Sequence, residues 1–265
     1  MSVMTDQSYL RQNQYRTGAN LDARILIHQR FSTNTYGWFR WVYEHLPIQS
    51  GDHLLEIGCG TAAFWRDNSS RLPANLNVAL ADLSLGMVAQ ARAGLGPEFS
   101  WKFMAADAQN LPLPTGCMNG VLANHMLYHV PDISRGVAEL QRVLARGGWL
   151  CAATNGTDHL IELRTLIEEF LPEYDINSNS ASRFGLQNGA DYLKPVFDQV
   201  DVYHYEDGLW ITEARPLVDF IKSMWQTERL DEAMAAEMLR SFESRIRQQG
   251  GIAIHKSTGI FLARR

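Results

Sequence analysis

One stretch constrains the fold of this chain more than any other. Residues 53–57 are an apolar segment that carries Glu56 near its end and runs directly into a glycine turn at 58–60, and a second apolar segment, 76–82, ends in Asp82. An apolar strand, a glycine turn, a helix and a second strand ending in a carboxylate form the pattern with which α/β sheets build a nucleotide site. The pattern therefore predicts a parallel sheet and a small-molecule enzyme.

The residue types in this stretch suit a ligand at the strand end. Gly58 and Gly60 can adopt backbone angles that a side chain disfavours, and the missing Cβ lets a ligand lie against the chain. Thr61 is placed to cap a helix that begins near Ala62, which would leave free N–H groups beside the ligand. Asp82 can accept hydrogen bonds from both hydroxyls of a ribose.

The same stretch also fits a second class of cofactor. Gly58, Gly60 and Ala63 satisfy the relaxed dinucleotide fingerprint G-x-G-x-x-G/A, and Asp82 stands about where its acidic residue belongs. This motif alone is therefore compatible with a nicotinamide dinucleotide as well as with another ribose-containing cofactor.

Five segments in order along the chain extend the pattern, at residues 56–61, 80–84, 106–112, 120–132 and 139–148. They resemble the motifs of the class I S-adenosylmethionine-dependent methyltransferases, especially the small-molecule branch (methyltransferase type 11) that includes the ubiquinone and menaquinone methyltransferases. The resemblance covers residues 52–156. It departs from the family in two places, 115–119 and 145–148, where an acidic residue and a Lys/Arg-Pro-Gly-Gly turn are usual; both lie away from the expected cofactor contacts.

The resemblance implies that S-adenosylmethionine binds and leaves as S-adenosylhomocysteine, with no metal. It implies that Glu56 lies near the methionine amine, Asp82 on the ribose and Leu83 beside the adenine. The Asp107 side chain and the Ala108 N–H would read the adenine edge, although a loop aspartate that caps its own turn would look similar. The implied cofactor-binding residues are Glu56, Gly58, Cys59, Gly60, Asp82, Leu83, Met87, Asp107, Ala108, Asn124, His125 and, from the region before the core, Tyr15.

Methyl transfer from a sulfonium depends on alignment and exclusion of water, and it needs a base only if the acceptor must lose a proton. His125 and His129 follow the predicted strand 118–124 at the edge that faces the ligand crevice, so both are candidate bases. In the alternative interpretation, His125 offers only its backbone and His129 packs in its loop. The candidate substrate-binding residues are His28, Phe31, His129, His159 and Trp210.

The resemblance implies a Rossmann-like, mostly parallel seven-stranded sheet flanked by helices, with an antiparallel last strand. We expect a helical cap at 1–48 and a methyltransferase domain at 49–265, whose core is 52–156 and whose helical insertions are about 157–196 and 212–249. The predicted strands are 53–57, 76–82, 100–105, 118–124, 148–154 and 200–205, with a final strand or hairpin in 251–263. The predicted helices are 62–71, 85–93, 133–144, 158–171, 216–225 and 231–249.

Composition limits the partners. The 265 residues are 46% hydrophobic and carry a net charge of −5, so the chain can bury a full core and has no basic field for nucleic acid. No apolar run approaches about 18 residues and the first residues are polar, so we expect a cytoplasmic protein without a membrane span. The three cysteines are widely spaced and are expected to be free thiols.

These observations favour transfer of a methyl group to a small-molecule acceptor by a monomer or homodimer. Two alternatives stay open at this point. One is an NAD-dependent oxidoreductase, and the other is a catalytically silent regulatory protein that binds S-adenosylmethionine.

Overall fold

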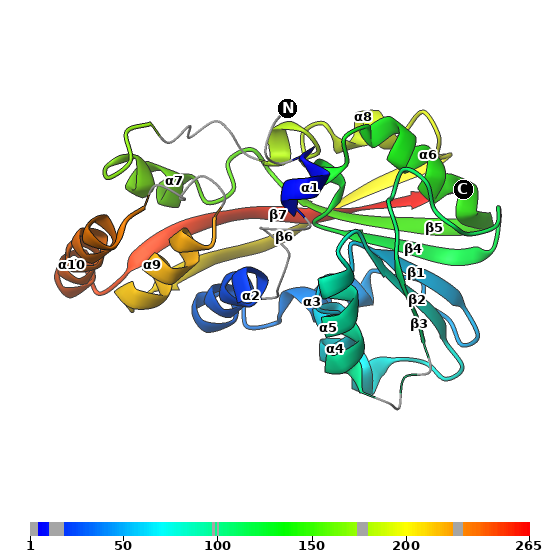
Figure 1. Cartoon of the computed structure of the whole chain (residues 1–265), viewed down its shortest axis with the longest axis horizontal. Coiled ribbons are helices and arrows are strands. Elements are labelled where there is room, and N and C mark those ends of the chain that lie inside the picture. The colour runs from blue at the N-terminus through cyan, green and yellow to red at the C-terminus, as the bar shows by residue number, and fades with distance from the viewer. Residues whose placement is uncertain (1–4, 11–18, 97–98, 100, 174–179, 225–229) are drawn as a thin grey trace.

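A seven-stranded sheet runs through the computed structural model, which describes residues 5–10, 19–96, 99, 101–173, 180–224 and 230–265 (Figure 1). The strand order is β3-β2-β1-β4-β5-β7-β6, in which the first five strands are parallel and β7 is antiparallel to both neighbours. This confirms the predicted fold class. The strands are β1 His53–Ile57, β2 Asn77–Asp82, β3 Lys102–Ala105, β4 Met118–Asn124, β5 Leu144–Asn155, β6 Gln199–Ile211 and β7 Ile252–Arg264.

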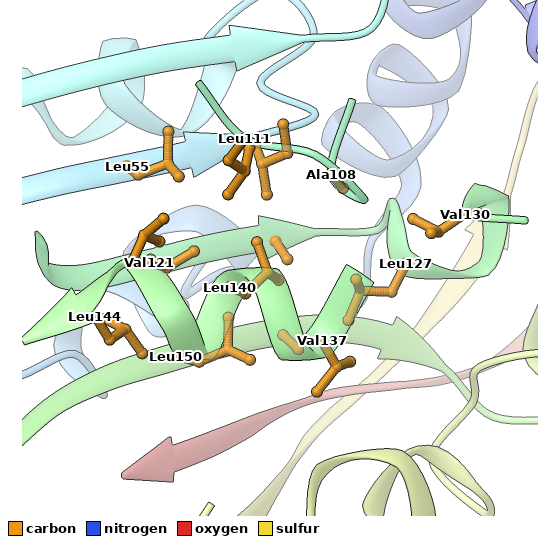
Figure 2. Close-up of a cluster of buried hydrophobic side chains, with 14 of the residues drawn as sticks. Leu55, Ala108, Leu111, Val121, Leu127, Val130, Val137, Leu140, Leu144 and Leu150 are labelled. Carbon is orange, nitrogen blue, oxygen red and sulfur yellow. The ribbon is translucent and has the colours of Figure 1, made fainter. Parts of the chain in front are cut away.

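Successive side chains of a strand point to opposite faces, and each face of this sheet has its own hydrophobic core. Leu55 and Val121 pack with α6 and α8 on one face (Figure 2), whereas Leu54 and Leu122 pack with α3, α4 and α5 on the other. The helices of the first face are α6 Ile133–Val143 and α8 Gly189–Leu193; those of the second are α3 Trp38–Glu44, α4 Ala63–Asn68, continued by η3 Ser69–Arg71, and α5 Leu85–Leu95.

The last two strands extend well beyond the others (Figure 1). β6 and β7 pair along their whole length, but β5 pairs with β7 only as far as Asn155 opposite Thr258. Residues 206–211 and 252–257, called the ribbon below, therefore project past the carboxyl edge of β4 and β5. A third hydrophobic core surrounds the ribbon and is built with α2 Ala19–Phe31, α7 Ile161–Glu168, α9 Ala214–Lys222 and α10 Glu232–Gln249.

Several local predictions were wrong in detail. Ala62 precedes α4 with a left-handed φ of +59°, so Thr61 does not cap the helix. The Thr61 hydroxyl is instead buried without a hydrogen-bond partner among the described residues. β5 begins at Leu144, before the predicted start at 148, because a bulge in its pairing with β4 takes the glycine turn into the strand. β6 continues to Ile211, well past the predicted end at 205. β7 is a single strand, which is one of the two forms predicted for the final segment.

Two further observations concern the predicted location and thiols. Within the described ranges, no helix is both long and apolar enough to cross a bilayer. Cys59, Cys117 and Cys151 are free, as predicted.

Candidate functional site

Glu56 forms a hydrogen-bonded centre where the carboxyl ends of β1 and β4 meet. The side chain is 2% exposed, and its two oxygens accept hydrogen bonds from Asn124 Nδ2 at 2.8 Å and Trp65 Nε1 at 2.7 Å. Burial raises the pKa of Glu56 to about 8, despite the opposing effect of these two bonds. Glu56 is therefore mostly protonated at neutral pH in the free protein. Trp65 was not among the predicted site residues.

The glycine turn follows β1 and is hydrogen-bonded to the end of β2. Gly58 has a φ of +70° and Gly60 a φ of +52°, and a Cβ on Gly58 would lie only 2.7 Å from the Cβ of Met126. The Gly60 N–H donates to Asp82 Oδ2 at 3.0 Å, and the Ser84 N–H donates to Oδ1 at 2.8 Å. Burial raises the pKa of Asp82 against these two bonds. Each carboxylate oxygen keeps a lone pair that can accept a ligand hydroxyl.

A cavity of about 420 Å³ opens beside Asp82, lined by residues 83–86 and 105–107. Asp107 lies at its rim, where Oδ1 accepts the Gln109 N–H at 2.9 Å and Oδ2 accepts Gln7 Nε2 at 2.8 Å. Asp107 thus caps its own turn and also anchors α1, which spans Gln7–Tyr9. Met87, Ala108 and Cys59 are buried around this region.

His125 and His129 occupy different environments. His125 follows β4 with a φ of +52°, which is rare outside glycine, and its ring lies on Trp38 with centroids 5.4 Å apart. Burial, and then the charge of Lys256, lowers its pKa to about 4. His129 lies in η4, Leu127–His129, with its ring on Tyr128 at 4.7 Å.

The structure brings His28 and His159 toward His125. A proton on any one of the three imidazoles would be repelled by Lys256, and protons on any two of them would repel each other. His28 Nδ1 is buried without a hydrogen-bond partner among the described residues, whereas His159 Nδ1 accepts the Ser257 N–H at 3.2 Å.

The remaining predicted substrate residues lie elsewhere. Phe31 is buried in the third core, around the ribbon. Trp210 is 44% exposed near the far end of the ribbon, on the face opposite Asp207, so the structure does not bring it to the histidines. Tyr15 lies outside the described residues.

A buried ion pair beside the histidines was missed. The Asp207 and Lys256 side chains are 0% and 6% exposed, and they pair across β6 and β7. Asp207 also accepts the Ser32 hydroxyl at 2.6 Å and the Asn34 N–H at 3.0 Å, which ties the segment after α2 to the ribbon. The sequence did hold a signal, because period-two alternation puts Lys256 on the same face as the apolar Ile254.

No set of His, Cys, Asp or Glu side chains within the described part of the chain is arranged to hold a metal ion.

Comparisons with known proteins match the central part of the chain to a protein family. Residues 55–152 match the family model described as a methyltransferase domain. The chain carries a methyltransferase domain. This confirms the resemblance to the class I enzymes, and none of the comparisons supports the oxidoreductase or regulatory alternatives.

Two curated relatives match at modest identity. A malonyl-[acyl-carrier protein] O-methyltransferase from Legionella pneumophila is 29% identical over 58% of this chain and 55% of its own length. A demethylmenaquinone methyltransferase from Symbiobacterium thermophilum is 27% identical over 54% of this chain and 57% of its own. The chain thus spans little more than half the length of these curated relatives.

Solved structures share the fold. Phosphoethanolamine N-methyltransferase 2 from Haemonchus contortus, solved with phosphomonomethylethanolamine and S-adenosylhomocysteine, aligns with a TM-score of 0.62 at 17% identity, over 100% of this chain and 60% of the other. The [4+2]-cyclase SpnF aligns with a TM-score of 0.53 at 18% identity, over 86% and 79%. Because proteins with such different names share the fold, the reaction has to be inferred from the residues of the site.

Proposed function

We propose that this protein transfers a methyl group from S-adenosylmethionine to a small-molecule acceptor. The observation that carries the proposal is the placement of Glu56, Asp82 and Asp107 on three successive strand ends around the glycine turn and its neighbouring cavity, within a segment that matches a methyltransferase domain. Carboxylates at these positions suit the amine, the ribose and the adenine of the donor.

The residues present fit the donor. The cavity lined by Leu83 has room for an adenine, and Asp82 has lone pairs for the ribose hydroxyls. Asp107 lies at the rim of this cavity, where an exocyclic amine would replace one of the amide donors, Gln7 Nε2 or Gln109 Nε2, that its carboxylate already accepts. Two buried oxygens near the glycine turn, Thr61 Oγ1 and Asn124 Oδ1, have no partner among the described residues and suit a polar ligand.

When bound, the donor supplies an electrophilic methyl group on a sulfonium. The protein then has to hold the acceptor in line with that methyl and keep water out. We assign this task to His28, His125 and His159 with the aromatic ring of Trp38, and we retain Phe31 and His129 as secondary candidates. The named relatives act on different acceptors, so the acceptor of this chain has to be inferred from its own residues.

Two measurements test the proposal. Calorimetric titration with S-adenosylmethionine, S-adenosylhomocysteine and NAD is expected to give binding of the first two only; binding of NAD alone would support the oxidoreductase. Incubation with methyl-labelled S-adenosylmethionine and a microbial metabolite extract is expected to move label into small molecules. Donor binding with no transfer to any fraction would instead support the regulatory alternative.

A further inference from the structure

His28, His125 and His159, called the imidazole cluster below, lie where an acceptor would meet the donor. β5 ends at Asn155, opposite Thr258 of β7, and two residues further along the ribbon Lys256 faces Asp207. His159 covers the edge of β7 that β5 leaves unpaired. The cluster therefore begins just past the strand ends that form the predicted donor site.

The three imidazoles are neutral in the free protein. Burial lowers the pKa of His28 to about 3, that of His125 to about 4 and that of His159 well below its ordinary value, and Lys256 adds to each effect. Asp207 opposes the shift of His28. Each neutral ring offers one N–H donor and one nitrogen lone pair.

The hydrogen-bonding groups of the cluster are mostly unused. His159 Nδ1 accepts the Ser257 N–H, so the proton of that ring is on Nε2. None of the other nitrogens of His28, His125 and His159 has a hydrogen-bond partner among the described residues, and His28 Nδ1 is buried in this state. Three N–H donors and two lone pairs are left for a ligand, beside the ammonium of Lys256. Donors therefore exceed acceptors.

We propose that this cluster binds a carboxylate of the acceptor and that the product is a methyl ester. The inference rests on the proposed methyl transfer and names its substrate class. A carboxylate has only acceptor atoms, which matches the excess of donors. The aromatic ring of Trp38, packed on both His125 and Tyr205 at 5.4 Å, supplies an apolar wall for the rest of the acceptor.

The acidity of the imidazoles supports a carboxylate over a phenol. A phenol would have to give its proton to a ring whose pKa burial has lowered to about 4, which disfavours the transfer. A carboxylate is already ionised at neutral pH and needs no base. One of its oxygens forms the new O–C bond to the methyl carbon while the C–S bond breaks and its electron pair stays on sulfur. The negative and positive charges both disappear, and no proton moves.

Asp207 is a positioning residue in this arrangement. It pairs with Lys256 from the adjacent strand and accepts the Ser32 hydroxyl and the Asn34 N–H from the segment after α2. These bonds fix that segment, and with it His28, against the ribbon.

The product of labelled methyl transfer tests the substrate class. A microbial metabolite extract is separated by ion exchange into acidic, neutral and basic fractions, and each is incubated with the protein and methyl-labelled S-adenosylmethionine. We expect label in the acidic fraction that mild alkali releases as volatile methanol, as for an ester. Alkali-stable label would overturn the carboxylate inference and leave methyl transfer intact, whereas no label in any fraction would overturn both.

Substitution of His159 tests the cluster. His159→Asn keeps an oxygen near Nδ1 for the Ser257 N–H and removes the Nε2 donor, whereas His159→Gln places an N–H near Nε2. We expect at least a tenfold loss of alkali-labile label in His159→Asn, a smaller loss in His159→Gln, and S-adenosylhomocysteine affinity within twofold of wild type in both. His204→Asn, at an exposed imidazole of β6, is the control and should match wild type. Wild-type transfer by His159→Asn would remove His159 from the site.

Discussion

Donor binding by this protein should be strongly pH-dependent, because Glu56 is protonated before the ligand arrives. Burial raises its pKa to about 8, and the carboxyl proton has a natural acceptor nearby. Asn124 Oδ1 is buried without a partner among the described residues, and rotation of the Asn124 amide would let a protonated Glu56 donate to it. A cationic amine placed beside Glu56 would favour the ionised form, so binding would release this proton.

The magnitude follows from the pKa. Below about pH 8 each unit of pH costs a tenfold loss of affinity if one proton must leave on binding, so the Kd of S-adenosylhomocysteine should fall about 100-fold from pH 5.5 to 7.5, or about 2.7 kcal/mol. The range lies below the Glu56 pKa throughout. The slope should therefore be constant across it.

Isothermal titration calorimetry at pH 5.5, 6.5 and 7.5, in two buffers of different ionisation enthalpy, measures both the Kd and the number of protons released. Glu56→Gln is the control: its amide can accept from Trp65 Nε1 and donate to Asn124 Oδ1, but it carries no proton to release. We expect nearly one proton released by the wild type and none by Glu56→Gln. A pH-independent Kd in the wild type, or an equal slope in both proteins, would refute the reasoning.

Three further outcomes follow from the same structure. Lys256→Met leaves the Asp207 carboxylate buried without its counter-ion and should lower the free energy of unfolding by about 3–5 kcal/mol in urea; the double variant with Asp207→Asn should regain part of it, and an equal loss in both would contradict this account. Gly58→Ala, with φ at +70° and a Cβ 2.7 Å from the Cβ of Met126, should cost about 1–3 kcal/mol in thermal unfolding. Measured against Met126→Gly alone, which lacks the Cβ that Gly58→Ala would meet, adding Gly58→Ala should cost only the backbone part, so no cost in that background would show that the backbone angle is not strained. Glu56 binds a proton more tightly in the folded than in the unfolded state, so the free protein should lose stability as pH rises from 4.5 to about 8, by up to about 5 kcal/mol, relative to Glu56→Gln; parallel stability curves would contradict the raised pKa.

Local sequence patterns predicted well the strands that form the proposed donor site. β1 and β4 match the predicted ranges 53–57 and 118–124, because a short apolar run bounded by turn residues has few alternatives to a buried strand. The capping prediction for Thr61 failed for an equally local reason. Ala62 takes a left-handed conformation that propensities do not favour, so the chain turns once more before α4 begins.

The proposed acceptor site depends on the pairing of β6 with β7, which no local sequence pattern specifies. The predicted strand 200–205 and the final segment 251–263 are separated by two predicted helices, and nothing in either one specifies that they pair in register over their whole length. Without that register, Asp207 and Lys256 are two ordinary charged residues. Once it is known, they are one buried ion pair. Trp65 was missed similarly, since its contact with Glu56 requires the angle of α4 relative to β1.

This division also explains why similarity to other methyltransferases says little about the acceptor of this protein. The family match covers residues 55–152, which contain Glu56, Asp82, Asp107 and, within the acceptor cluster, only His125. His28 comes from α2 before the match, and His159 and the Asp207–Lys256 pair come from the segments after it. A sheet of this kind can keep its donor site while the ribbon and α2 change independently, because the third core, which packs them, is separate from the two cores of the sheet. Proteins that share the acceptor of this chain should therefore be recognised by His28, Asp207 and Lys256 in these positions of the fold, rather than by overall identity within the domain.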